Sequence, residues 1–112
     1  MTLGEKQRQF TLMVAKLIIW AYDHGYELTL GEAQRSQAQA DANARSGAGI
    51  SKSLHLKRLA IDLNLFKDGI YLTDSAVHLP LGEYWESLGG SWGGRFSRPD
   101  GNHYSLEHEG VR

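Results

Sequence analysis

Residues 59–65, with the sequence LAIDLNL, alternate between large apolar side chains and smaller or polar ones. Because successive side chains of a strand point to opposite faces, this stretch predicts a β-strand with one core face and one polar face. Asp62 lies on the polar face of an otherwise apolar segment. A bare carboxylate there is costly unless it is paired or bound to a metal. The alternative is that Asp62 and Asn64 simply face solvent on a half-exposed sheet.

Working outward from this strand, the remaining sequence predicts one α+β domain over residues 1–112, with a small antiparallel sheet flanked by helices. Apolar residues at three- and four-residue steps indicate helices, and an Asp68-Gly69 pair is typical of a hairpin turn. Residues 46–53 and 90–101 are expected to be loops, the second lined by aromatic residues. The expected elements are helix 4–24, strand 26–30, helix 36–45, strands 59–65 and 71–72, helix 80–88 and strand 103–106.

Composition excludes several classes of function. The 12 basic and 13 acidic residues give a net charge of -1, which is too weak a field to attract nucleic acid. We expect no membrane insertion, because no run of about 18 apolar residues is present, and no secretory signal is recognisable. The chain has no cysteine, so any metal must be held by histidine and carboxylate side chains. A monomer that stays in the cytoplasm where it is made is expected.

Three residues fit an open metal site. Catalytic zinc typically takes three histidine or carboxylate ligands and leaves one position for water, and His55, Asp62 and His103 meet that description. Seven residues of extended strand would separate the first two by roughly 23 Å, which is too far for one ion. The chain is therefore predicted to turn between them, near Lys57-Arg58. The competing interpretation is that His55 is a loop histidine with no functional role.

A further carboxylate, Asp100, lies three residues before His103. This spacing brings it close enough to act as a general base toward the water of a zinc site. The sequence therefore contains a candidate ligand set and a candidate proton acceptor.

The spacing of these residues resembles a known family. Residues 53–62, SLHLKRLAID, resemble the SxHxxGxAxD motif of the M15 zinc peptidases, and residues 100–104, DGNHY, are similar to the second motif of that family. The family includes D-alanyl-D-alanine carboxypeptidases, vancomycin-resistance dipeptidases and phage L-alanyl-D-glutamate endolysins. The resemblance covers about residues 28–106. It implies a Hedgehog/DD-peptidase-like fold, a Zn²⁺ cofactor and a peptidoglycan stem peptide as substrate.

The resemblance also implies roles for residues around the zinc motifs. Arg35, predicted just outside a helix N-terminus, corresponds to an arginine that meets the scissile carbonyl or a substrate carboxylate. Such a guanidinium stabilises a developing oxyanion or grips a carboxylate. Ser53, Gln39 and Trp92 are expected to contact substrate. Plain structural roles are the alternatives: a surface arginine, a turn-forming Ser53 and a core Trp92.

The sequence departs from the family pattern at three positions. Arg58 replaces a glycine, so the turn there is expected to use a different backbone geometry. Ser105 stands where many members have glutamate. Asp100 replaces the glutamate of the dipeptidase branch, a choice that resembles the phage endolysin branch. The resemblance thus implies an L-alanyl-D-glutamate endopeptidase that waits in the host cytoplasm and acts on the cell wall after the membrane opens.

Two rival functions remain open at this point. A D-alanyl-D-alanine carboxypeptidase would need a closed cationic pocket, which Arg35, Arg95 and Arg98 could supply. A catalytically idle wall-binding module of the same fold is the other rival, although such a module has no need of a positioned base such as Asp100.

Overall fold

The computed structural model describes residues 1–33 and 54–112. Its first element is helix α1 (Leu3–Asp23), where the sequence predicts a helix. Thr2 begins the helix with a capping box, because its side chain accepts a hydrogen bond from the backbone N–H of Glu5 and the Glu5 carboxylate accepts one in return. The helix ends before Gly25, whose φ of 84° suits a glycine. Its buried face consists of Phe10, Met13, Leu17 and Ala21.

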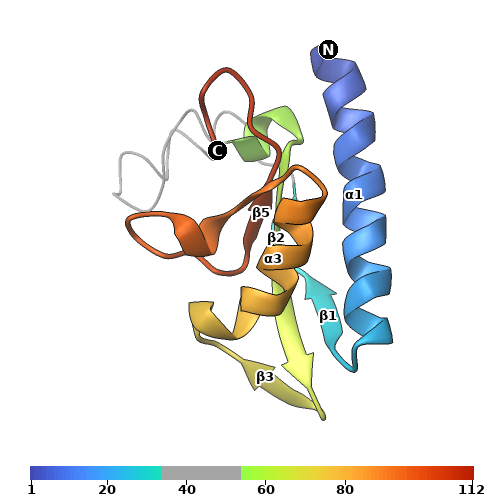
Figure 1. The fold of residues 1–112 in the computed structure, drawn as a ribbon, viewed down its shortest axis with the longest axis vertical. Coiled ribbons are helices and arrows are strands. Elements are labelled where there is room, and N and C mark those ends of the chain that lie inside the picture. The colour runs from blue at the N-terminus through green and yellow to red at the C-terminus, as the bar shows by residue number, and fades with distance from the viewer. Residues whose placement is uncertain (34–53) are drawn as a thin grey trace.

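The described strands form one five-stranded antiparallel sheet centred on β2 (Ala60–Lys67). On one edge, β2 pairs with β1 (Glu27–Leu30). Its other edge is divided, since β5 (His103–Ser105) pairs with the first residues of β2 and β3 (Ile70–Leu72) pairs with the last. The short strand β4 (Ser91–Trp92) pairs with β5. β2 is therefore the strand that positions the rest of the sheet (Figure 1).

The predicted alternation of β2 is confirmed. Ile61, Leu63 and Leu65 are buried, while Asp62 and Asn64 are partly exposed. Ala60, which the alternation places on the polar face, is also buried. The predicted hairpin to β3 is present as well, and the positive φ angles of Asp68 (52°) and Gly69 (76°) are those of a two-residue hairpin turn.

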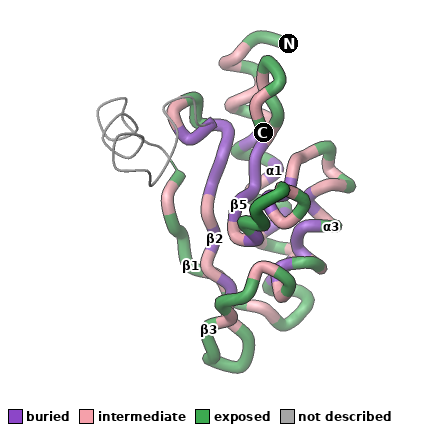
Figure 2. Tube along the Cα trace, turned by 90° about the vertical axis from the view of Figure 1, so that its left-hand side faces the viewer, coloured by how far each residue is buried: buried purple, intermediate pink, exposed green. Residues whose placement is uncertain are grey.

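A single core joins the sheet to α1 and to the second described helix, α3 (Leu79–Ser87). α3 follows the 3₁₀ helix η2 (Ser75–His78) and is drawn in front of β2 in Figure 1. It contacts β5, where the indole N–H of Trp85 donates to the carbonyl oxygen of Ser105 at 2.9 Å. Figure 2 shows the buried residues concentrated along β2 and β5, whereas the β2–β3 turn is exposed. Within the described residues, neither helix is long and apolar enough to cross a membrane.

The structure corrects one part of the sequence prediction. Residues 90–101, expected to be a loop, contain β4 and the 3₁₀ helix η3 (Gly93–Arg95). Trp92 is 4% exposed and belongs to the core, and its indole N–H donates to the carbonyl oxygen of Gly101 at 2.7 Å. Trp92 thus has the core position that the alternative interpretation expects, and its contact with a substrate stays a prediction. The helix expected over residues 36–45 and the loop expected over 46–53 lie outside the described residues.

Candidate metal centre

The β2–β5 pairing brings two of the predicted ligands together. Asp62 lies directly opposite His103 in the antiparallel register, which places both side chains on the same face of the sheet. The Nδ1 atom of His103 is 3.7 Å from the Oδ1 atom of Asp62. The sheet itself therefore positions this half of the candidate site.

The third predicted ligand, His55, lies in the 3₁₀ helix η1 (Leu54–Lys57), directly before β2. A hydrogen bond from the backbone N–H of Leu59 to the carbonyl oxygen of Leu54 closes the turn at 3.0 Å. The turn brings Nε2 of His55 to 3.5 Å from Oδ1 of Asp62. The prediction of a turn near residues 57 and 58 is confirmed.

Arg58 adopts a φ of 57° at the end of this turn, in the left-handed region that favours glycine. The expectation that the arginine would impose a different backbone geometry is therefore wrong. The chain makes a left-handed turn with a non-glycine residue, which typically costs about 1 kcal/mol or more.

The three side chains fit a zinc ion. One possible ligand atom from each of His55, Asp62 and His103 lies within 4.8 Å of the others. The separations of 3.5 and 3.7 Å from Asp62 Oδ1 are longer than ordinary hydrogen bonds. They are close to the roughly 3.3 Å expected between two atoms bound tetrahedrally to zinc with bonds of about 2.0 Å.

Of two buried atoms in this cluster that lack a hydrogen-bond partner, Asp62 Oδ1 supports the same interpretation. Asp62 Oδ1 and His103 Nε2 are inaccessible to solvent and have no hydrogen-bond partner in the described structure. Buried polar atoms are normally paired, and a carboxylate oxygen is the more costly one to leave alone. A cation between the three side chains would satisfy Asp62 Oδ1. His103 would then bind through Nδ1, the nitrogen that faces Asp62.

Contacts of the second ring nitrogen, Nδ1, hold the orientation of the His55 ring. Its Nδ1 atom is 3.4 Å from the carbonyl oxygen of Ala33 and 3.9 Å from Oε1 of Glu32. Metal-binding histidines commonly direct their other ring nitrogen to such an oxygen, which fixes the tautomer. This arrangement leaves Nε2 of His55 directed to the cluster. Sequence reasoning did not identify Glu32 and Ala33, because neither lies in the two zinc motifs.

The electrostatic environment keeps Asp62 ionised. Burial by itself would raise the pKa of Asp62, but contacts with His103 and His55 outweigh burial and lower the pKa to about 2. An ionised carboxylate between two imidazoles is a suitable donor set for a divalent cation.

Asp100 lies at the start of the turn that leads to His103. Its backbone N–H donates to the carbonyl oxygen of Gly93 at 2.9 Å, and its own carbonyl accepts from the N–H of His103 at 3.0 Å. Partial burial of the carboxyl group raises the pKa of Asp100, and the negative charge of Asp62 raises it further, against the opposing effect of His103 and His55. Asp100 is thus electrostatically coupled to the cluster.

The glycine at position 93 is needed for this approach. A Cβ atom there would lie 2.1 Å from the Asp100 carbonyl oxygen and 2.8 Å from the Cβ atom of His103. Because Gly93 has no side chain, the turn from Asp100 to His103 packs directly against the Gly93 backbone.

The other predicted site residues are not brought to the cluster by the described structure. Arg35, Gln39 and Ser53 lie outside the described residues, and Trp92 is in the core. The sequence also gave no sign of a buried pair beside the site, in which Nδ1 of His78 is 2.7 Å from the Tyr104 hydroxyl. The two residues are 26 positions apart, and only the fold joins them.

Comparison with known families agrees with this site. The sequence model of the M15 peptidase family described as D-alanyl-D-alanine carboxypeptidase matches residues 46–106, which is more than half of the chain. The matched region contains His55, Asp62, Asp100 and His103. The chain therefore belongs to the M15 peptidase family.

Two solved structures share the fold. The L-Ala D-Glu endopeptidase ChiX of Serratia marcescens aligns with a TM-score of 0.70 and 21% identity, over 93% of this chain and 85% of ChiX. The E175A mutant of the D,D-pentapeptidase VanY from a VanB-type resistance cassette, solved with Zn(II), aligns with a TM-score of 0.62 and 18% identity. That alignment covers 87% of this chain and 70% of VanY. No curated protein matches the chain by sequence.

Proposed function

We propose that this chain is a zinc-dependent peptidase that cleaves the bond between L-Ala and D-Glu in the stem peptide of bacterial peptidoglycan. The observation that carries the proposal is the convergence of His55, Asp62 and His103, with Asp100 electrostatically coupled to them. ChiX, which shares the fold, is an L-Ala D-Glu endopeptidase by name, and this supports the choice of bond.

The residues divide the chemistry between them. His55, Asp62 and His103 would hold zinc, which supplies Lewis acidity that polarises a carbonyl group and lowers the pKa of water. Asp100 accepts a proton from the attacking water and passes it to the leaving amine. The raised pKa of Asp100 suits both transfers, because an effective general base has a pKa nearer the working pH. Arg35 is proposed to balance negative charge on the substrate oxygen.

One contact favours the endopeptidase over the carboxypeptidase. A carboxypeptidase needs cations for a terminal carboxylate, and Arg95 is one of the three candidates. Its guanidinium is already paired with Glu86, through contacts of 3.1 and 3.2 Å, and lies over the Trp92 ring. A substrate carboxylate would therefore have to compete with Glu86 of α3 for Arg95.

The test uses a defined stem pentapeptide and purified peptidoglycan, with the products identified by mass spectrometry. We expect a new amino end on D-Glu. Release of D-Ala alone, with the L-Ala to D-Glu bond intact, would replace the proposal with the carboxypeptidase. If zinc is bound and neither product forms, the chain is an idle wall-binding module. The Asp100→Asn variant is the control for contaminating peptidases.

We further propose that the chain acts as a phage endolysin, which the aspartate form of the Asp100-x-x-His103 motif supports. Production in a bacterial host should cause lysis only after an added agent permeabilises the inner membrane. The Asp100→Asn variant should not lyse the same cells. Permeabilised cells that remain intact despite active enzyme would contradict the endolysin role.

A further inference from the structure

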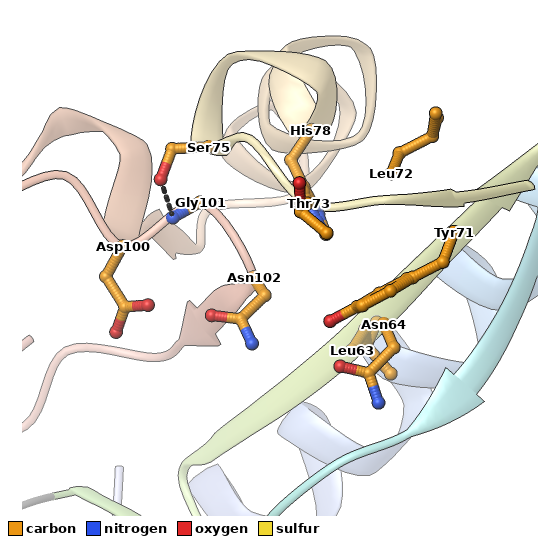
Figure 3. A pocket seen from close by; sticks show the side chains of 10 residues that line it. All are labelled: Leu63, Asn64, Tyr71, Leu72, Thr73, Ser75, His78, Asp100, Gly101 and Asn102. Atoms are coloured by element: carbon orange, nitrogen blue, oxygen red, sulfur yellow. Dashed lines mark hydrogen bonds between the residues drawn. The ribbon is translucent and has the colours of Figure 1, made fainter.

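A polar cavity of about 170 Å³ adjoins the candidate metal centre. It lies on the divided edge of β2, between the residues that pair with β5 and those that pair with β3. At this point the backbone N–H of Leu63 donates to the carbonyl oxygen of Asn102. Asn64 and Tyr71 border it on one side, and Asp100 and Asn102 border it on the other (Figure 3). The mechanism proposed above uses only one of these residues, Asp100.

The cavity lies beside the candidate metal centre along β2. Asp62 and Asn64 are alternate residues of that strand, so their side chains lie on the same face, roughly 7 Å apart. Asp100 lines the cavity and also interacts electrostatically with Asp62. A substrate whose scissile bond lies at the metal centre would therefore place a neighbouring group in the cavity.

Several polar groups of the cavity are available to a ligand. The Nδ2 atom of Asn64 donates to the Thr29 hydroxyl at 3.2 Å, which leaves its Oδ1 atom as an acceptor. Figure 3 shows the Tyr71 hydroxyl directed into the space between Asn64 and Asn102. The single hydrogen bond drawn among the lining residues runs from the Gly101 N–H to the Ser75 hydroxyl. The Asn102 amide and the Asp100 carboxylate are thus not hydrogen-bonded to each other.

The lining of the cavity is acidic rather than basic. Its ten lining residues, all within the described part of the chain, include no lysine and no arginine. His78, which also lines it, is 3% exposed, and burial lowers its pKa to about 4, so it is neutral near pH 7. Asp100 is therefore the one acidic side chain among these ten lining residues.

We propose that this cavity is a substrate subsite for a nitrogen group that donates hydrogen bonds, either a primary carboxamide or an ammonium, on the leaving-group side of the scissile bond. The proposal rests on the proposed function and deepens it. A carboxylate in the same place would meet Asp100 with no lysine or arginine among the described lining residues, which is costly in a partly desolvated site. A carboxamide or ammonium instead donates to Asn64 Oδ1, Asn102 Oδ1 or the Asp100 carboxylate.

The first experiment compares matched stem peptides. One carries a free α-carboxylate on D-Glu, and the other carries a carboxamide there. A second pair differs only in acetylation of the amino group of a lysine in the third position. We expect kcat/KM to be about tenfold higher for the amidated peptide, or about tenfold lower after lysine acetylation if the ammonium is the recognised group. Equal rates for all four peptides would overturn the subsite.

A positive charge added to the lining tests whether the cavity causes the preference between the peptides. Asn102→Lys adds a cation to the lining and should shift the preference towards the free carboxylate, with zinc content unchanged. Ala15→Lys adds the same charge on the exposed side of α1 and should leave the preference as in the unmodified protein. The same shift in both variants would contradict the assignment.

A binding measurement separates this proposal from the proposed function. In the metal-free protein, the favoured peptide should move the side-chain amide resonances of Asn64 and Asn102, whereas its matched partner should not. If the resonances move but no peptide is cleaved by the zinc-loaded protein, the subsite stands and the peptidase proposal fails. If peptides are cleaved without preference and the resonances stay in place, the peptidase stands and the subsite is wrong.

Discussion

Asp62 and His103 are register partners on β2 and β5, and their facing Oδ1 and Nδ1 atoms are 3.7 Å apart. Two of the three candidate ligands are thus placed by backbone pairing at the centre of the sheet. His55 instead depends on the turn formed by η1 and Arg58. A change in the turn should therefore affect His55 alone, whereas a change in either strand should affect the other two ligands together.

Protein purified without an affinity tag should contain one zinc ion per chain. His103→Ala should abolish stoichiometric zinc, because two ligands rarely hold the ion tightly. His108→Ala, at a histidine outside the cluster, is the matched control and should retain it. Binding should weaken in acid, since the ligand side chains must be deprotonated to bind the metal. Elemental analysis after dialysis measures all of these, and full zinc in His103→Ala would remove His103 from the ligand set.

Asp100→Asn should retain zinc and fold but lose activity by a factor of roughly 100 or more, because the amide does not accept the proton. Steady-state kinetics on the stem peptide, together with zinc analysis and circular dichroism, check this prediction. Loss of zinc from the variant would make Asp100 a ligand. Undiminished turnover would exclude it from the mechanism.

Arg58→Gly should stabilise the protein by about 1 kcal/mol in the free energy of unfolding, because glycine adopts a positive φ without the steric cost of a Cβ atom. Arg58 is exposed, so few contacts are lost. Arg58→Ala is the matched control, since it removes the same side chain but keeps the cost. Urea denaturation distinguishes the two variants. Equal stability would show that the turn is not strained at this residue.

The buried His78 should make the protein less stable in mild acid. Burial lowers its pKa from 6.5 to about 4, so between these values the unfolded chain binds more protons than the folded one. The His78 contribution is fully present above about pH 6.5 and is lost as the pH falls towards about 4. Denaturation at a series of pH values should show this dependence, and it should be weaker in His78→Gln. An unchanged profile in that variant would assign the effect to other groups.

The sequence predicted those elements whose patterns are local. The alternation of residues 59–65 and the helical spacing of residues 4–24 are confirmed as β2 and α1. The candidate ligands were also accessible to prediction, because residue type and spacing alone limit which side chains suit zinc. The register that joins Asp62 to His103 is a long-range relationship that no local pattern contains.

Two differences from the sequence prediction concern glycine and the backbone conformation it allows. Glycines around Trp92 were interpreted as a sign of a loop, but they make room for its ring. A Cβ atom at Gly82 or Gly94 would lie 2.1 or 2.3 Å from the indole of Trp92. Arg58 was misjudged for the opposite reason, since a non-glycine residue occupies the left-handed conformation. Residue type indicates which backbone conformation is preferred at a position, whereas tertiary packing decides which conformation the chain adopts there.

The divided edge of β2 has a consequence for hydrogen exchange. The amide of Asp62 donates to the carbonyl oxygen of Glu32 on one side, and the amide of Leu63 donates to that of Asn102 on the other. Both amides lie on a strand that has neighbours along both edges, so they should exchange with solvent only when the whole sheet opens. The candidate centre is thus attached to the slowest-opening part of the molecule, and its geometry should persist through the local fluctuations that open exposed turns.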